Sequence, residues 1–402
     1  MPREFTEDRP AIAYSHVDHN MDIRDHAVGS RLPKPTTQPA VVGDPDDFHC
    51  LMLPEGAPVK LDDYLTTDAP QIGLHVVSFT DATLVSLYWP HTLFDAMGKR
   101  ALLDAWTLVL QGRDDKVLPL YGVETDPLAE FGKHPTEPYK LAERAMSIPM
   151  LIQYGLSHIF EFVGAQETRM VCIPASFMKK LREETLQDLA AQSENGEGLF
   201  LTDGDIICAW WLRLATAHLP RSSDRTLVVN NAYQLRNVLE KDLLPPGNAH
   251  VFNATGFINV VMTTKDVFEK PTSYIALQFR RAIEELGTRE QVESFAAMIR
   301  ASRYKLPPFF GDRTMHMVTF SNWGKAKLFE TDFSAALRDP GLSPQNSSHR
   351  PGKPRYIQNC QFGLTLPNAF PIIGKDGNGN YWISGYLNKG QWQKMEQLLA
   401  EA

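Results

Sequence analysis

The stretch Tyr88-Trp89-Pro90-His91-Thr92-Leu93-Phe94-Asp95-Ala96-Met97-Gly98 decides the fold prediction for this chain of 402 residues. Before it, residues 72–79 and 83–89 are rich in β-branched and aromatic side chains, which predicts a β-hairpin. After Pro90, apolar residues recur at helical spacing through 96–111, with Asp95 placed to cap this helix and Gly112 to end it. His91 therefore lies at a strand-to-helix corner, where an imidazole can face a cavity and act as a general base near neutral pH.

The pentapeptide from His91 to Asp95 also has a purely structural interpretation. A histidine at a strand end can be a core residue whose ring is bonded to a backbone carbonyl, and Asp95 can be a helix cap and nothing more. Twelve histidines in the chain make a chance match to so short a motif realistic. The pentapeptide alone leaves both interpretations open.

Length and composition restrict the class of protein. A chain of 402 residues predicts two domains, and 43% hydrophobic with 22% charged residues is a soluble globular balance. The net charge of −8 argues against a nucleic-acid-binding protein. No apolar run approaches the roughly 20 residues that span a bilayer, and the first residues are charged, so we expect a cytoplasmic protein without a membrane segment. We also expect a monomer. The four cysteines lack metal-like spacing, so no metal site is expected.

Strands and helices alternate irregularly along the rest of the chain, which predicts an α/β fold with mixed sheets. Residues 1–48 are polar and are expected to be irregular, as is a loop at 193–198. Residues 122–147 are rich in proline and charge, which indicates a crossover between two halves. The remaining predictions are strands at 169–173, 226–231, 256–263, 371–373 and 381–383, and helices at 177–191, 204–217, 272–286, 289–303 and 390–401.

The stretch around His91 resembles the HxxxD region of the BAHD acyltransferases, which are CoA-dependent enzymes of plant and fungal secondary metabolism. Three further segments resemble motifs of the same family in the same order. These segments are Leu201-Thr202-Asp203-Gly204-Asp205 with the following helix, Asn230 to Arg236 with Pro245-Pro246-Gly247-Asn248 and Asn253-Ala254, and Phe320-Ser321-Asn322-Trp323-Gly324-Lys325 in the place of DFGWGK. The resemblance covers roughly residues 70–390, and the Ser-Asn-Trp variant is similar to fungal members.

The resemblance implies two domains of the chloramphenicol-acetyltransferase type with a tunnel at their interface. It places an N-terminal domain at 1–121, a linker at 122–165 and a C-terminal domain at 166–402. It also implies that His91 is the general base, that Asp95 orients the loop through an ionic contact, and that acyl-CoA is a co-substrate, with no permanently bound cofactor. Trp323 is a candidate oxyanion donor or a packing residue, and the candidates for contacts with substrate or CoA are Ser321, Asn322, Lys325, Lys327, Arg236 and Arg303.

The sequence departs from the family pattern at two places. Phe320 stands where the family has an aspartate that pairs with an arginine, so we expect Arg236 to need another partner, since a buried unpaired charge is costly. The family also carries a longer segment before the HxxxD motif. The missing segment would form the first strand and helix of the N-terminal half, so we expect either that a partner covers the surface it leaves open or that this chain is a truncated or repurposed member of the family.

The resulting functional prediction is an acyl-CoA-dependent O-acyltransferase that acts on a hydroxyl, or an amine, of a small secondary metabolite. One alternative keeps the fold but changes the reaction to a condensation or cyclisation of a polyketide or terpenoid intermediate. Another is a metabolite binder without catalysis, and a third is a protein-interaction module in which His91 has no chemical role. Resemblance of fold cannot decide among these alternatives.

Overall fold

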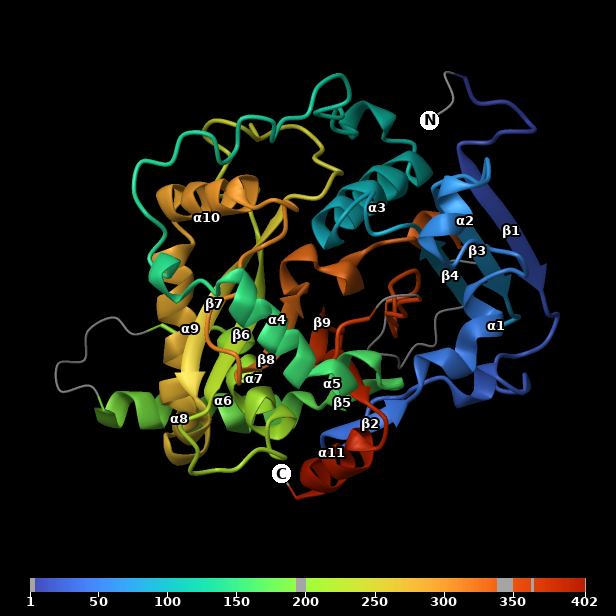
Figure 1. The fold of residues 1–402 in the computed structure, drawn as a ribbon. Coiled ribbons are helices and arrows are strands. Elements are labelled where there is room, and N and C mark those ends of the chain that lie inside the picture. Colours follow the sequence, from blue (N-terminus) through green and yellow to red (C-terminus); the bar gives the residue numbers. More distant parts are fainter. Residues whose placement is uncertain (1–3, 193–199, 338–349, 363–364, 402) are drawn as a thin grey trace.

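The computed structural model describes residues 4–192, 200–337, 350–362 and 365–401 (Figure 1). The loop expected at 193–198 lies outside these residues. The described chain forms a small sheet and a large sheet, which Figure 1 shows at the right and at the centre left of the molecule. None of the described helices combines the length and the apolar character that crossing a bilayer requires.

The small sheet carries the expected hairpin. Its order is β1-β3-β4, with β1 (Ile12–Asp18) parallel to β3 (Ile72–Ser78) and β3 antiparallel to β4 (Thr83–Tyr88). Alternate residues of β3 are buried, and Val77 packs with Leu51 and Phe79 beneath the sheet. The short helices α1 (His49–Met52) and α2 (Leu61–Leu65) lie beside it. β1 corrects the expectation that residues 1–48 are irregular.

The large sheet has seven strands and is mixed, as predicted. Its order is β2 (Ala40–Gly43), β5 (Gln166–Ile173), β10 (Tyr381–Asn388), β9 (Ala369–Lys375), β8 (His316–Asn322), β6 (Thr226–Gln234) and β7 (Thr255–Thr263). β8 runs parallel to both β9 and β6, and the other neighbouring pairs are antiparallel. β2 is a second strand within the segment that we expected to be irregular. It pairs with β5, so residues before 121 contribute to both sheets, unlike the predicted division at that point.

Helices cover the large sheet and form the main core with it. α7 (Asp203–Ala215) starts with a capping box, in which Thr202 and Asp205 exchange side-chain-to-backbone hydrogen bonds. Trp211 of α7 and Phe279 of α9 (Thr272–Leu286) belong to the same buried cluster as Phe320 of β8. The other helices on this side of the chain are α6 (Ala175–Gln192), α8 (Thr264–Glu269), α10 (Arg289–Ala301) and α11 (Gln391–Ala400).

The segment between the halves is only partly irregular. It contains α4 (Ile148–Ser157) and α5 (Ile159–Val163), which lie within the predicted linker at 122–165. Sequence reasoning missed both helices. The described residues also form short 3-10 helices at Gly29–Arg31, Pro45–Phe48, Asp114–Lys116, Ala142–Arg144, Gly324–Ala326, Leu328–Glu330 and Ser334–Ala336.

Helix α3 (Ala96–Leu110) joins the two halves. Gly112 follows its end with φ +66°, a left-handed conformation that suits glycine. Leu103 of α3 shares a buried cluster with Ala326 and Leu328, which follow strand β8 of the large sheet. Arg100 strengthens this contact by donating hydrogen bonds to the carbonyl oxygens of Ala326 and Lys327. The second turn of α3 is therefore fixed against the large half.

Candidate active site

Asp95 caps helix α3, as the sequence predicts. One carboxylate oxygen accepts hydrogen bonds from the backbone N–H groups of Met97 (3.0 Å) and Gly98 (2.8 Å). These N–H groups belong to the first turn, where no partner exists within the helix. The cap fixes the direction in which the His91 loop enters α3.

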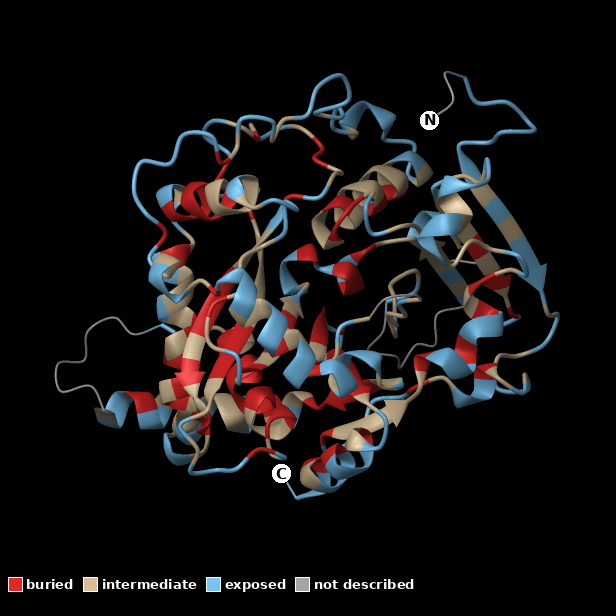
Figure 2. Cartoon of the chain, viewed as in Figure 1, coloured by how far each residue is buried: buried red, intermediate tan, exposed pale blue. Residues whose placement is uncertain are grey.

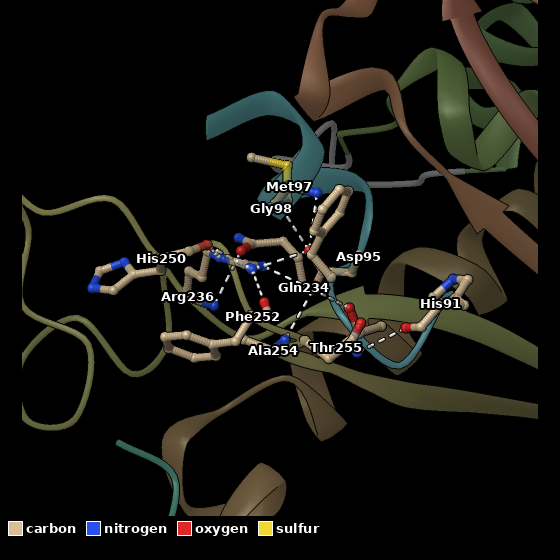
Figure 3. Close-up of polar contacts among 12 residues, drawn as sticks. His91, Asp95, Met97, Gly98, Gln234, Arg236, His250, Phe252, Ala254 and Thr255 are labelled. Carbon is tan, nitrogen blue, oxygen red and sulfur yellow. Dashed lines mark hydrogen bonds and ion pairs between the residues drawn. The ribbon is translucent and has the colours of Figure 1, made fainter. Parts of the chain in front are cut away.

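The same carboxylate joins the two halves of the molecule (Figure 3). Arg236 donates a hydrogen bond to each carboxylate oxygen of Asp95 at 3.0 Å, in a bidentate ion pair. The backbone N–H of Ala254 (2.9 Å) and the hydroxyl of Thr255 (2.8 Å) donate to Asp95 as well. Burial alone raises the pKa of Asp95, but the hydrogen bonds and charge of Arg236, together with hydrogen bonds from the N–H groups of Ala254 and Gly98, make the net shift of the pKa downward. Asp95 is therefore held as a buried carboxylate that is 5% exposed.

Arg236 has its partner in Asp95, which answers the question raised by Phe320. Phe320 is fully buried in the core, and Arg236 has an ion pair without an aspartate at that position. Arg236 also donates to the carbonyl oxygens of His250 and Phe252. The guanidinium of Arg236 thus donates to Asp95 and to these carbonyl oxygens. These contacts favour a structural role for Arg236 over the predicted contact with CoA. The pattern is the ionic contact that the resemblance implied for Asp95, here with Arg236 as the cation.

His91 is exposed, whereas its backbone is held in place. The side-chain amide of Asn253 donates to the carbonyl oxygens of His91 (2.9 Å) and Thr92 (3.1 Å). Pro90 accepts a hydrogen bond from the N–H of Leu93 at 2.8 Å, which closes a turn around His91. The imidazole points away from the Asp95–Arg236 pair (Figure 3), and its ring nitrogens have no hydrogen bond to any part of the chain that the structure describes. The interpretation of His91 as a satisfied core histidine is therefore wrong.

Two close contacts stiffen the corner on which His91 lies. The indole N–H of Trp89 donates to the carbonyl oxygen of Phe94 (3.1 Å), and the two rings stack at 4.6 Å. Gly98 lies so close to the segment after Arg236 that an added Cβ would stand 2.0 Å from the carbonyl oxygen of Val251. Only glycine fits there. The His91 loop is thus positioned by both halves of the molecule.

The segment around Trp323 faces the first turn of α3. The indole N–H of Trp323 donates to the hydroxyl of Ser321 at 2.9 Å, and Asn322 accepts from the N–H of Gly324 at 2.9 Å. Trp323 is half-buried and packs against two of the core clusters. These contacts use the indole donor within its own segment, which favours the packing interpretation over the oxyanion one.

The predicted basic residues lie in different places. Lys325 and Lys327 are exposed beside α3, and the Lys327 ammonium lies 3.7 Å from a carboxylate oxygen of Glu330. Arg303 is exposed just after α10, where its guanidinium lies over the ring of Tyr304. Arg100 of α3 donates to the carbonyl oxygens of Ala326 and Lys327, which brings the segment with Lys325 and Lys327 next to α3. Among the described residues, no contact joins Arg303 to α3 or to this segment.

Lys99 is a site residue that sequence reasoning missed. Its ammonium lies 4.3 Å from the ring centre of Trp323 and 5.4 Å from that of Trp89, so it links the two motif segments by cation–π contacts. Burial lowers the pKa of Lys99 to about 8. The sequence offered one indication of an unusual lysine. Lys99 lies in the first turn of the predicted helix, where the helix dipole disfavours a cation. Asn253 was noted only as part of a motif, and no local pattern marks its contact with the His91 loop.

Comparisons with known proteins agree with this architecture. A family model described as "Transferase family" matches residues 44–336. The protein "Transcriptional regulator calD" of Penicillium decumbens is 40% identical over 407 residues, which cover 100% of this chain and 82% of that protein. "Acetyltransferase adrJ" of Penicillium rubens is 32% identical over 406 residues, covering 99% of this chain and 82% of that protein.

A solved structure shows the same fold. The crystal structure of F. graminearum TRI101 complexed with coenzyme A and deoxynivalenol has a TM-score of 0.66 at 13% identity, and the match covers 98% of this chain and 80% of that one. The expected α/β fold with two chloramphenicol-acetyltransferase-like domains is thereby confirmed. The matched family model spans most of the chain, and the chain belongs to the transferase family, as a BAHD-type acyltransferase similar to fungal members.

Proposed function

We propose that this protein transfers an acyl group from a CoA thioester to a hydroxyl group of a small secondary metabolite, with His91 as the general base. The observation that carries the proposal is the contrast at the HxxxD corner. The imidazole of His91 is exposed and free of protein hydrogen bonds among the described residues, while its backbone is held by Asn253 and its helix by Asp95. The thioester is already activated, so the reaction requires no covalent enzyme intermediate. The acceptor hydroxyl must still lose its proton, and a positioned base can take it.

The proposed reaction moves one proton through His91. The imidazole takes the proton of the acceptor hydroxyl as its oxygen attacks the thioester carbonyl. A new C–O bond forms, the C–S bond breaks, and the protonated imidazole gives the proton to the leaving CoA thiolate. Such acid–base catalysis contributes about 10² to 10⁴ in rate. Asp95 acts only as a positioning residue, because its oxygens bind Arg236, Ala254, Thr255 and the first turn of α3.

Further parts of the proposal concern substrate contacts. Lys325 and Lys327 are exposed beside the His91 helix and are our candidates for the CoA phosphates, since an ammonium ion suits a phosphate group. Ser321 and Asn322 hold the Trp323 segment, so we propose that they act through its position. The interface tunnel and the monomeric state remain predictions.

The test compares His91→Ala with His134→Ala, which removes an exposed histidine of the linker. Each protein is incubated with acetyl-CoA or a longer acyl-CoA and a panel of polyketide and terpenoid alcohols. Release of free thiol and the mass gain of the acceptor are measured together. We expect His134→Ala to match the unmodified protein and His91→Ala to lose at least about 100-fold in rate. Undiminished transfer by His91→Ala would refute the role of His91, and binding of an acceptor without any turnover would support the metabolite-binding alternative.

A further inference from the structure

Lys99 of α3 carries a charge that the proposed reaction does not use. Its ammonium lies 4.3 Å from the ring centre of Trp323 and 5.4 Å from that of Trp89, and it makes no hydrogen bond or ion pair with the part of the chain that the structure describes. The side chain is half-buried, and burial disfavours the charged form, which lowers the pKa of Lys99 to about 8. The helix dipole also disfavours a cation in the first turn of α3. The surroundings of Lys99 therefore compensate its charge only in part.

The carboxylates on this stretch of the chain are bound elsewhere. Residues 83–110 contain two of them, Asp95 and Asp104. Asp95 binds Arg236, and Asp104 lies 2.6 Å from a guanidinium nitrogen of Arg100. Neither carboxylate forms an ion pair with the ammonium between the two indoles.

The carboxylates on the facing segment are bound elsewhere as well. Residues 316–332, which include the nearer of the two indoles, contain Glu330 and Asp332. Glu330 lies 3.7 Å from the ammonium of Lys327, and Asp332 accepts a hydrogen bond from the N–H of Ser334 at 2.9 Å. The two segments, both of which the structure describes in full, thus offer the half-buried ammonium no carboxylate partner.

Packing alone does not require a charge at this position. A methionine has a similar length and is well suited to fill the space between two aromatic rings. It would keep the apolar part of the contact and avoid the cost of a half-buried cation. What the ammonium of Lys99 adds is a positive charge at a fixed place, and an anion from outside the chain would compensate it.

This charge lies at the corner that carries His91. Trp89 precedes His91 by two residues, and the ring of Trp89 contacts the ammonium of Lys99. In Figure 2 helix α3 is mostly of intermediate burial, whereas the strands of the large sheet are largely buried. The half-buried ammonium is therefore within reach of an anion that binds beside the exposed imidazole.

The proposed reaction brings anions to this corner. CoA carries phosphate groups, and an ammonium binds a phosphate as a point charge. A carboxylate on the acyl group would offer the same chemistry. We propose that Lys99 binds an oxyanion of the acyl donor, either a phosphate of CoA or a carboxylate of its acyl group, while the two indoles hold the ammonium in place. This inference rests on the proposed function and assigns to Lys99 the recognition of the charge of the donor.

Calorimetric titrations of the full chain with CoA and with succinyl-CoA separate the two sources of the anion. Both ligands carry the phosphates, and only succinyl-CoA has a carboxylate on an acyl group. At pH 7, below the pKa of about 8, Lys99→Met removes a positive charge. Contact with a phosphate predicts that Kd rises by at least about tenfold for both ligands, whereas contact with the acyl carboxylate predicts this rise for succinyl-CoA alone. Lys99→Arg keeps a cation that can stack on the indoles, so its Kd values should stay close to those of the unmodified protein.

Three measurements separate this test from folding and from the role of His91. The urea unfolding midpoint of Lys99→Met at pH 7 should not fall, because the half-buried ammonium is costly in the folded state. Lys179→Met, which removes a lysine of α6 that is 77% exposed, should leave both Kd values unchanged. His91→Ala should lose acyl transfer but should bind CoA with the same Kd as the unmodified protein.

The inference is overturned if Lys99→Met binds both ligands like the unmodified protein. It is also overturned if Lys99→Met slows transfer from acetyl-pantetheine, which has neither phosphate nor acyl carboxylate, as much as transfer from acetyl-CoA, because an equal loss indicates damage to the site. In both cases acyl transfer by the unmodified protein leaves the proposed function standing. If the unmodified protein binds neither ligand and transfers no acyl group, the proposed function fails together with this inference.

Discussion

Replacing Asp95 with asparagine tests the ion pair that joins the two halves. Asparagine has nearly the same shape and is itself a good helix cap, so the first turn of α3 keeps an acceptor. What is lost is the negative charge opposite Arg236, whose side chain is 11% exposed. Removing one partner of a buried pair leaves the other charge uncompensated and costs about 3–5 kcal/mol. We therefore expect Asp95→Asn to lower the free energy of unfolding by about that amount in urea titrations.

The control for this prediction is Asp242→Asn. Asp242 pairs with Arg289, but its side chain is 44% exposed, so this loss should cost only about 0–1 kcal/mol. If the cost of Asp95→Asn arises from a stranded charge, adding Arg236→Met should restore at least about 1 kcal/mol. The reasoning is refuted if Asp95→Asn costs no more than Asp242→Asn, or if the effects of Asp95→Asn and Arg236→Met simply add.

Three further outcomes follow from the same structure. Gly98→Ala would place a Cβ 2.0 Å from the Val251 carbonyl oxygen, so we expect at least about 1–3 kcal/mol of destabilisation in urea titrations, and a neutral result would contradict that close contact. Burial lowers the pKa of Lys99 to about 8, so the folded state bears a cost for the charged form below pH 8 that disappears as pH rises toward 10.5. Lys99→Met should therefore stabilise the protein at pH 7 by up to about 3 kcal/mol, less the lost contact with Trp323, and should flatten the rise in stability between pH 8 and 10. Burial also lowers the pKa of His316 to about 3, so the neutral ring is favoured in the folded state. The free energy of unfolding should therefore be unaffected by His316 above pH 6.5 and should fall by about 2 kcal/mol as the pH is lowered to 5. His316→Leu should abolish this fall in unfolding titrations across the same pH range.

Local patterns predicted the elements whose signals are local. Strand β3 of the hairpin before His91 alternates buried and half-buried positions, and α3 has both a capping residue and a glycine after its end. The capping box of α7 was equally legible in its first residues. These elements begin and end near the predicted residues because their sequences show both the apolar periodicity and the residues that start or end the element.

The missed elements lack that kind of signal. β1 has no buried residue, and Ile12 and Tyr14 lie on its exposed side, so its sequence does not show a buried apolar face. Its partner strand β3 is about sixty residues away in the sequence. α4 and α5 turn their apolar side chains toward solvent, so their sequence does not resemble that of a helix with an inward apolar face.

The candidate site divides in the same way. His91 and Asp95 were recognisable from a short motif, but the partner of Asp95 is 141 residues away in the sequence. Such a contact leaves no periodic trace, and a single sequence offers no other indication of it. Lys99 likewise gains its surroundings only when Trp89 and Trp323 are brought together by the fold.

The measurement that tests the central claim most directly is a crystal structure of the full chain with bound CoA and an acceptor alcohol. If His91 is the general base, the acceptor hydroxyl should lie within about 3 Å of a His91 ring nitrogen, directly or through one water, with the CoA sulfur next to that hydroxyl. Both molecules bound with their reacting atoms far from His91, beyond the reach of a bridging water, would contradict the account.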